Sequence, residues 1–358
     1  MERRQFLCAI ITSLASIRCS RIPLSAQEAT GRTSLLKDML IIDAHAHPAG
    51  ILRTEPMKLA SRALAIEPMK KLGAVTSSFS AVGDVEREDN FYDRTAASYG
   101  EVIEQLNRAK EVLEFVDAKI VRKSSDIPNP SDSGNKIGAL LSLEGADPLE
   151  NEPDKIDNLY QYGVRIITLM HYRISQFGDI MTAPPKHKGL TREGGKLISK
   201  MQELGIVVDV AHAHIDTLKD IAKMTGKPLI DSHTGFSYSS VPTGGRSRTW
   251  KEMEMVVATG GVVCTWLLAV KTRTIQRETF LDWAKEIKVM KERFGIEHIG
   301  LGTDTGGYLK GTRLIDGYKN LLDLTKLADT MIEVGLTKND VTAFMGGNLT
   351  RILKECIG

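Results

Sequence analysis

Five apolar, strand-like runs of this sequence end in a residue that can bind a metal ion. They are Met39–His47, Ile137–Glu144, Ile206–His212, Pro228–His233 and Ile299–Asp304. Imidazole nitrogens and carboxylate oxygens are common protein ligands of zinc and similar divalent metals. The sequence therefore offers a set of metal ligands, provided that the fold brings the ends of the five runs together.

The first run carries two histidines, His45 and His47, separated by a single alanine. Side chains alternate along an extended segment, so residues two positions apart point to the same side. A pair of structural histidines is the alternative interpretation. The position of the pair at the end of a strand, directly before Pro48, favours metal binding, and we expect both imidazoles to be ligands.

Three further runs supply Glu144, His212 and His233. Glu144 ends so apolar a run that an unpaired carboxylate there would cost several kcal/mol, and a cation is its natural partner. Each histidine alone could be a buried structural residue, but together with the first pair they place four imidazoles at strand ends. One carboxylate between two histidine pairs could bridge two metal ions about 3.5–4 Å apart, the spacing of two-metal hydrolases.

Asp304 closes the last of the five runs. Aspartate is a preferred N-cap of helices, so a structural role is the alternative. Opposite a metal-bound water, its carboxylate could instead act as a general base and later return the proton to the leaving group. We expect the catalytic role.

Strand-like and helix-like runs alternate from about residue 36 onward, which is typical of the α/β class with a parallel sheet. Eight strands are expected, at residues 40–45, 74–81, 137–144, 164–170, 206–212, 228–233, 262–268 and 298–304. Eight such units favour closure into a (β/α)8 TIM barrel, whose active site lies at the C-terminal ends of the strands. A doubly wound open sheet is the alternative, although no glycine-rich phosphate loop follows the first strand.

The composition fits a single barrel domain at residues 36–358. The stretch from 48 to 134 is long for one strand–helix–strand unit, so we expect an insertion there that holds an extra helix or a lid. The formal net charge is +2 over 358 residues, and no basic stripe with interleaved aromatics supports nucleic-acid binding. Cys264 and Cys356 lack metal-binding spacing and are expected to be buried thiols.

Residues 1–26 differ from the rest of the chain. Two arginines at positions 3 and 4 precede an apolar run at residues 7–17, a pattern typical of an export signal. Arg-Arg-x-Phe-Leu resembles the bacterial twin-arginine motif, and the apolar run is too short for a stable membrane span. We expect export to the periplasm or the extracellular space, with a chance apolar run as the alternative.

In combination, the segments that carry these residues resemble the renal or membrane dipeptidase family of the amidohydrolase superfamily. They occur in family order from about residue 39 to 352 and so extend over nearly the whole chain after the expected signal. The matching segments are Ile42–His47, Ser142–Gly145, Gly163–His171, Gly189–Thr191, Leu204–His212, Asp231–Thr234, Ile299–Asp304 and Gly346–Arg351.

The resemblance implies a (β/α)8 barrel that holds two zinc ions. Glu144 would bridge the ions, with His45 and the residue at position 47 on one of them. His212 and His233 would bind the other, and Asp304 would handle the proton of the bridging water.

The resemblance also implies contacts with a small-molecule substrate, and a homodimer is possible. His171 would contact the substrate and its tetrahedral intermediate. Arg246 would bind the substrate carboxylate, which a guanidinium can hold through two hydrogen bonds. Arg248 is the neighbouring alternative for that role.

One position departs from the family, which usually has aspartate where this chain has His47. A neutral ligand there raises the net positive charge of the site and could shift the substrate preference. The first hypothesis is a zinc-dependent metallo-dipeptidase that cleaves the amide bond of dipeptides through a metal-bridging hydroxide. The alternative is an amidohydrolase acting on a cyclic amide, a lactone or an N-acyl amino acid, and a non-catalytic metal-binding barrel is a third reading.

Overall fold

The computed structural model describes most of the chain after residue 33. The described residues are 34–55, 57–87, 90–134, 136–150, 152–237, 245–271, 276–307 and 312–358. The export signal expected at residues 1–26 lies outside these ranges, so it stays a prediction, and so does the homodimer.

Eight parallel strands form the centre of the fold, and all eight correspond to strands expected from the sequence. In sheet order they are β1 (Ile41–Asp43), β2 (Val75–Val82), β6 (Ile137–Glu144), β7 (Val164–Thr168), β8 (Val207–Asp209), β9 (Ile230–Phe236), β11 (Val262–Thr265) and β14 (Ile299–Leu301).

Backbone hydrogen bonds join the two ends of this sheet. The amide of Ala44 donates to the carbonyl oxygen of Leu301 at 2.9 Å, and the amide of Asp304 donates to that of His45 at 2.8 Å. An open doubly wound sheet would leave its two edge strands apart. The predicted (β/α)8 TIM barrel is therefore confirmed.

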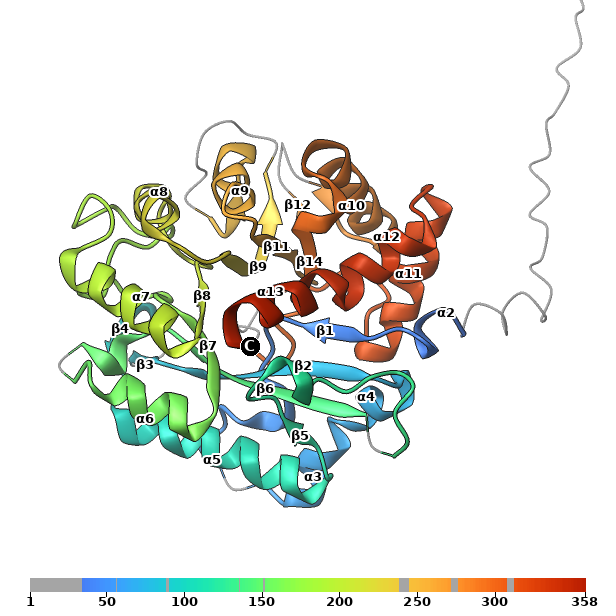
Figure 1. Cartoon of the computed structure of the whole chain (residues 1–358), viewed down its shortest axis with the longest axis horizontal. Helices are drawn as coiled ribbons and strands as arrows, with labels where there is room; N and C mark the ends of the chain where they lie inside the picture. Colours follow the sequence, from blue (N-terminus) through green and yellow to red (C-terminus); the bar gives the residue numbers. More distant parts are fainter. Residues whose placement is uncertain are drawn as a thin grey trace, which may run out of the picture.

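Helices surround the strands in a ring (Figure 1). They are α2 (Ser34–Lys37), α3 (Leu59–Leu64), α4 (Glu67–Leu72), α5 (Tyr99–Phe115), α6 (Lys155–Tyr162), α7 (Arg192–Leu204), α8 (Ile215–Met224), α9 (Trp250–Val257), α10 (Phe280–Phe294), α11 (Leu324–Glu333), α12 (Lys338–Thr342) and α13 (Asn348–Ile357). Hydrogen-bonded caps mark several helix starts, among them the capping box that Thr337 and Asp340 form at the start of α12. With helices outside and side chains inside, the strands are covered on both faces, and every residue of β6 is buried.

The last helix, α13, closes one end of the barrel and crosses in front of the strands in Figure 1. Its apolar residues Leu349, Ile352 and Leu353 pack in one cluster with Val207 and Ile230, which lie at the starts of β8 and β9. This end of the barrel is filled with apolar side chains. Polar chemistry inside the barrel is therefore confined to the opposite end, where the strands finish.

The long stretch from residue 48 to 134 contains the second barrel strand as well as additional elements. Helices α3 and α4 precede β2, and an antiparallel hairpin of β3 (Asp84–Arg87) and β4 (Asn90–Ala96) follows it directly. Smaller additions are β5 (Lys119–Ile120), β10 (Ser247–Arg248), β12 (Val270–Lys271) and β13 (Gln276–Arg277). No helix that the structure describes combines the length and hydropathy needed to cross a bilayer.

Candidate active site

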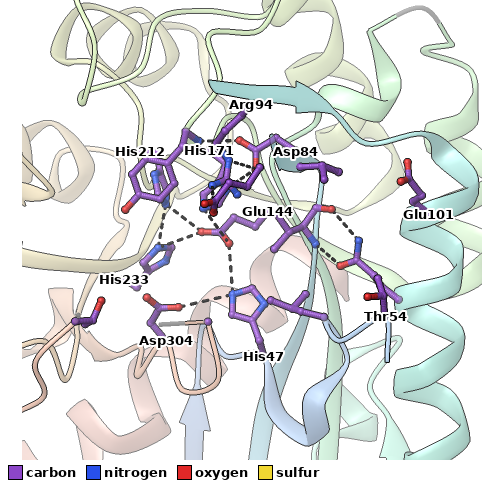
Figure 2. A pocket seen from close by; sticks show the side chains of 18 of the residues that line it. His47, Thr54, Asp84, Arg94, Glu101, Glu144, His171, His212, His233 and Asp304 are labelled. Carbon is purple, nitrogen blue, oxygen red and sulfur yellow. Dashed lines mark hydrogen bonds and ion pairs between the residues drawn. The ribbon is translucent and has the colours of Figure 1, made fainter. Parts of the chain in front are cut away.

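Glu144, the last residue of β6, lies at the centre of a cluster of imidazoles at the C-terminal end of the barrel (Figure 2). Its Oε1 atom lies 3.0 Å from Nε2 of His212, 3.3 Å from that of His233 and 3.4 Å from that of His45. Its Oε2 atom lies 3.4 Å from Nε2 of His47. The fold thus brings together all five residues expected as ligands, and all five are buried.

Two buried aspartates hold the loops that carry these histidines. Asp209, at the end of β8, accepts hydrogen bonds from the backbone amides of Ala211 and Ser232 and from the Ser232 hydroxyl. Asp43, at the end of β1, accepts from the amide and the hydroxyl of Thr303. The carboxylates therefore connect neighbouring strand ends just below the cluster and fix the backbone from which the ligands project.

Hydrogen bonds at the rear of two imidazoles determine which nitrogen faces the cluster centre. Nδ1 of His47 lies 2.6 Å from the carbonyl oxygen of Ser80, so this nitrogen must carry the proton. Nδ1 of His233 lies 2.9 Å from the Ser232 hydroxyl, which itself donates to Asp209 at 2.5 Å, so this nitrogen donates as well. In the neutral rings, both Nε2 atoms then present a lone pair to the cluster, as metal ligation requires.

The cluster has more acceptors than its own protons can satisfy. Nε2 of His47 lies 3.1 Å from Nε2 of His45, and Nε2 of His212 lies 3.2 Å from that of His233, with the Glu144 carboxylate among them. Lone pairs and a carboxylate that converge in a buried space require a cation, and this donor set suits a borderline divalent metal. The residues present therefore fit a metal centre.

Electrostatics in the cluster agree with this assignment. Burial opposes ionisation of Glu144, but the charges of His171 and His45 outweigh it and hold its pKa well below the ordinary value. Burial lowers the pKa of His212 and of His233 well below the usual value for histidine, so both rings are neutral. An ionised carboxylate beside the two neutral imidazoles of His212 and His233 is the state that binds metal ions. His45 differs, because its burial is outweighed by the charges of Glu144 and Asp304, which raise its pKa to about 9, so a bound metal ion would displace its proton.

Asp304 lies at the edge of the cluster with its carboxylate directed at the ligands (Figure 2). Its Oδ1 atom lies 3.8 Å from Nε2 of His45 and 3.7 Å from Nε2 of His47. Burial raises its pKa above the ordinary value, against the opposing charges of these two histidines. Among the described residues, the next helical turn begins only at Leu321, which argues against the N-cap role.

His171, just beyond the end of β7, faces the same carboxylate from another side. Its Nε2 atom lies 3.5 Å from Oε2 of Glu144, and its Nδ1 atom lies 2.7 Å from Oδ1 of Asp84. Asp84 and its ion-pair partner Arg94 belong to the β3–β4 hairpin, and our sequence analysis missed both. Asp84 follows the end of β2 by two residues, but β2 contains three serines and is not one of the apolar runs that indicated the other site residues.

Arg248, the alternative carboxylate-binding residue, is fully buried in the barrel wall. Its guanidinium forms ion pairs with Asp231 at 2.8 Å and with Glu252 at 3.2 Å. It also donates to the carbonyl oxygens of Ala213 and Val210. Because these partners occupy its donors, Arg248 has a structural role.

Arg246, in contrast, lies beside the cluster with part of its hydrogen-bonding capacity unused. One guanidinium nitrogen donates to the carbonyl oxygen of His233 at 3.0 Å, and another faces the sulfur of Met181. The guanidinium lies over the ring of Trp266, 5.2 Å from its centroid. Nε of Arg246 is buried and has no hydrogen-bond partner among the described residues. A half-buried cation with a buried, unused donor is suited to bind an anion.

The different environments of the two arginines predict different effects of replacing them. Arg248→Met should lower the free energy of unfolding by about 3–5 kcal/mol, because it leaves two buried carboxylates without their cation. Arg246→Met should change it much less, because no carboxylate in the described part of the chain pairs with Arg246. Urea unfolding monitored by circular dichroism measures both. Equal destabilisation by the two variants would contradict this assignment.

A cavity of about 320 Å³ opens from the cluster and extends toward α5. The metal-binding side chains line one end, and Thr54, Glu101, Glu104 and Arg108 line the other. Figure 2 shows Glu101 and Thr54 on the side of the cavity opposite His233 and Asp304. This volume is in the range of small-molecule sites. The remaining histidines of the described chain, His187, His214 and His298, bond elsewhere to Ser175, Asp216 and Gly261.

A sequence profile of the membrane dipeptidase family, peptidase family M19, matches residues 31–357. The chain belongs to this family. The match includes the whole barrel and every residue of the cluster, so the resemblance noted from the sequence is confirmed.

Individual relatives are distant from this chain. The dipeptidase verJ of Clonostachys rogersoniana is 26% identical over 285 residues, which are 78% of this chain and 72% of the relative. The dipeptidase tcpJ of Claviceps purpurea is 24% identical over 275 residues, which are 75% of this chain but only 63% of the relative. At these identities, residues must be compared one by one.

Solved structures of similar fold cover almost the whole barrel. An amidohydrolase from Pseudomonas aeruginosa superposes with a TM-score of 0.74 at 19% identity, over 91% of this chain and 99% of its own. A metallopeptidase from Rhodobacter sphaeroides, liganded with a phosphinate mimic of the dipeptide L-Ala-D-Ala, superposes with a TM-score of 0.72 at 17% identity. The superposition covers 89% of this chain and 99% of that structure. These structures support the barrel architecture.

Proposed function

We propose that this protein is a metal-dependent dipeptidase that hydrolyses the amide bond of small dipeptides. The observation that carries the proposal is the buried ring of imidazoles around Glu144, at one end of a cavity that fits a small molecule. An arginine with an unused donor beside the ring adds a site for a free carboxylate. Membership of the membrane dipeptidase family agrees with this activity.

We propose that the resident cofactor is a pair of zinc ions. Glu144 would serve as a ligand of both ions, with His45 and His47 as the imidazole ligands of one and His212 and His233 as those of the other. When bound, such ions polarise the scissile carbonyl and lower the pKa of water to about 7. The arrangement of Nε2 lone pairs around both carboxylate oxygens supports a site for more than one ion.

The residues around the ligands have separate tasks in the proposed reaction. Arg246 binds the free carboxylate of the dipeptide and so places the amide bond over the cluster. Water attacks the carbonyl carbon, and His171 donates a hydrogen bond from Nε2 to the oxygen that becomes negative. Asp304 takes the proton that the water loses and delivers it to the amine as the C–N bond breaks.

The charge state of His171 supports its task. Burial opposes protonation of this ring, but the charges of Asp84 and Glu144 outweigh it and raise its pKa above the usual value for histidine. A protonated ring can donate from both nitrogens at once. Nε2 is then a donor directed at the end of the cavity where the carbonyl would lie.

Arg246→Met should lower kcat/KM for dipeptides about 100-fold or more, because two charge-assisted hydrogen bonds to the substrate are lost, each worth about 1.5 kcal/mol or more. Dipeptide amides, which lack the free carboxylate, should be equally poor substrates of both enzymes. Steady-state kinetics with the matched acid and amide of one dipeptide measure this difference. A similar loss on both substrates would contradict the role of Arg246.

The proposed function is tested by metal analysis of protein purified without added zinc, followed by turnover of a dipeptide library that includes D-residues at the C-terminal position. Two equivalents of zinc and chelator-sensitive hydrolysis of dipeptides are expected. Turnover of lactones, cyclic amides or N-acyl amino acids without turnover of dipeptides would support the alternative substrates. Bound zinc without any hydrolysis would indicate a non-catalytic barrel.

A further inference from the structure

The carboxylate of Asp84 lies behind the cluster, at the first residue of β3, and its side chain is completely buried. It accepts hydrogen bonds from Nδ1 of His171 at 2.7 Å and from the backbone amide of Tyr172 at 3.1 Å. Nε of Arg94 lies 3.1 Å from the same oxygen as His171. Three donors from two separate segments thus converge on one carboxylate, as the ion pairs and hydrogen bonds in Figure 2 show.

The backbone is adapted to bring Asp84 to this place. Gly83 lies between the end of β2 and Asp84, and a Cβ atom there would lie 1.9 Å from the carbonyl oxygen of Gly145. Only glycine permits this approach of the chain to the segment that follows Glu144. The hairpin therefore starts directly against the end of β6, with Asp84 behind His171.

These contacts fix the orientation of the His171 ring. With Nδ1 held by Asp84, Nε2 lies 3.5 Å from Oε2 of Glu144 and faces the centre of the cluster. The ring also packs edge-on against His212 and Tyr172, with centroid separations of 4.6 Å in both cases. A 180° flip of the ring about the Cβ–Cγ bond would break the hydrogen bond between Nδ1 and Asp84. The carboxylate therefore selects the flip state in which Nε2 faces the cluster.

We propose that Asp84 is a positioning residue for the hydrolytic reaction, which acts by holding His171 with Nε2 directed at the scissile carbonyl. The inference rests on the proposed dipeptidase function. It assigns a catalytic contribution to the β3–β4 hairpin, which supplies both Asp84 and Arg94 although neither is a metal ligand in our assignment.

The requirement is for a carboxylate, because all the converging groups are donors. An asparagine at this position would present its amide nitrogen either to the backbone N–H of Tyr172 or to Nδ1 of His171. In the first case two donors face each other, and in the second the ring must accept instead of donate. In either case one of the two contacts and the negative charge are lost, so Asp84→Asn keeps the size of the side chain but weakens its hold on His171.

The test is a double-mutant cycle between Asp84→Asn and His171→Ala on the metal-loaded enzyme. Asp84→Asn alone should lower kcat about 10–100-fold, the usual effect of removing the partner that orients an active-site histidine, and leave KM nearly unchanged. In the His171→Ala background, the same substitution should cost less than about twofold, because the residue through which Asp84 acts is gone. Metal content is measured for every variant.

Asp340→Asn is the matched control. Asp340 is a buried carboxylate on which the amide and hydroxyl of Thr337 and the ammonium group of Lys291 converge, but it caps α12 on the outside of the barrel. The Asp340→Asn variant should have a lower free energy of unfolding but an unchanged kcat.

Three outcomes would overturn the role of Asp84: equal losses in both backgrounds, an effect on KM alone, or loss of bound metal in Asp84→Asn. A wild-type chain that hydrolyses no dipeptide would instead refute the proposed function. In that case, NMR of histidine-labelled protein still tests the geometry. A hydrogen-bonded Nδ1 proton of His171 that disappears in Asp84→Ala supports the contact, and its absence from the wild type contradicts it.

Discussion

Glu144→Gln is expected to abolish metal binding and dipeptide hydrolysis together. The carboxylate lies within 3.5 Å of the Nε2 atoms of all five surrounding imidazoles, so no other residue can replace it at the centre. Glutamine has nearly the same shape but removes the negative charge and turns one acceptor into a donor. The loss in kcat/KM should be roughly 10⁴-fold, the scale of removing a central catalytic group.

Metal content from elemental analysis and turnover of a dipeptide under saturating conditions measure the two effects side by side. Glu286→Gln is the control, because Glu286 is also buried beside an arginine, Arg277, but lies on α10 outside the cluster. The Glu286→Gln variant should keep its metal content and its activity, even if its free energy of unfolding is lower. A Glu144→Gln protein that retained full metal content and turnover would remove the basis of the proposed function.

Asp304→Asn should lower kcat by about 10²–10⁴-fold, the range of general acid–base catalysis, with little change in KM. The amide keeps the size of the side chain but cannot take up the proton of water or deliver it to the amine. Bound metal should persist, since the carboxylate lies farther from the histidines than Glu144 does.

Asp316→Asn provides the comparison for this variant, because Asp316 is exposed and pairs only weakly with Arg313. Kinetics combined with metal analysis separate two explanations. A lower kcat with unchanged metal content supports proton transfer by Asp304. Loss of one equivalent of metal would show that Asp304 is a ligand, and an unchanged kcat would exclude it from the reaction.

The barrel could be predicted because its strands alternate with helical patterns, and because five of the expected apolar runs end in a polar residue at the barrel mouth. Three strands that lead to site residues end earlier than expected: β1 stops at Asp43, β8 at Asp209 and β14 at Leu301. Beyond these points the backbone bends to direct the ligands inward. Sequence pattern cannot show this bend, because most of the bending residues are as buried as the strands themselves.

The choice between Arg246 and Arg248 could not be made from sequence. The two residues lie two positions apart, and they differ in the residues that surround each guanidinium in the folded chain. The buried partner of Arg248 is Asp231, seventeen positions earlier, and no local pattern connects them. Asp84 was missed for a related reason. Its partner His171 is 87 residues away, and the hairpin that carries it has no counterpart in the regular strand–helix alternation.

His47 shows how a departure from the family pattern can be accommodated. Its ring is oriented as a metal ligand would need to be, since Nδ1 bonds to the Ser80 carbonyl oxygen and Nε2 faces Glu144. The position therefore still offers one lone pair, but it contributes no negative charge. A more positive site favours anionic substrates and transition states.

Two residues of the site hold a costly backbone conformation. His212 and Asp304 have φ values of 66° and 57°, in the left-handed region where a residue with a Cβ atom loses on the order of 1 kcal/mol relative to glycine. Both residues lie where the chain turns inward beyond a strand end, and both side chains face the cluster, His212 toward Glu144 and Asp304 toward His45 and His47. The bends that aim the site therefore carry a cost that the regular strands do not.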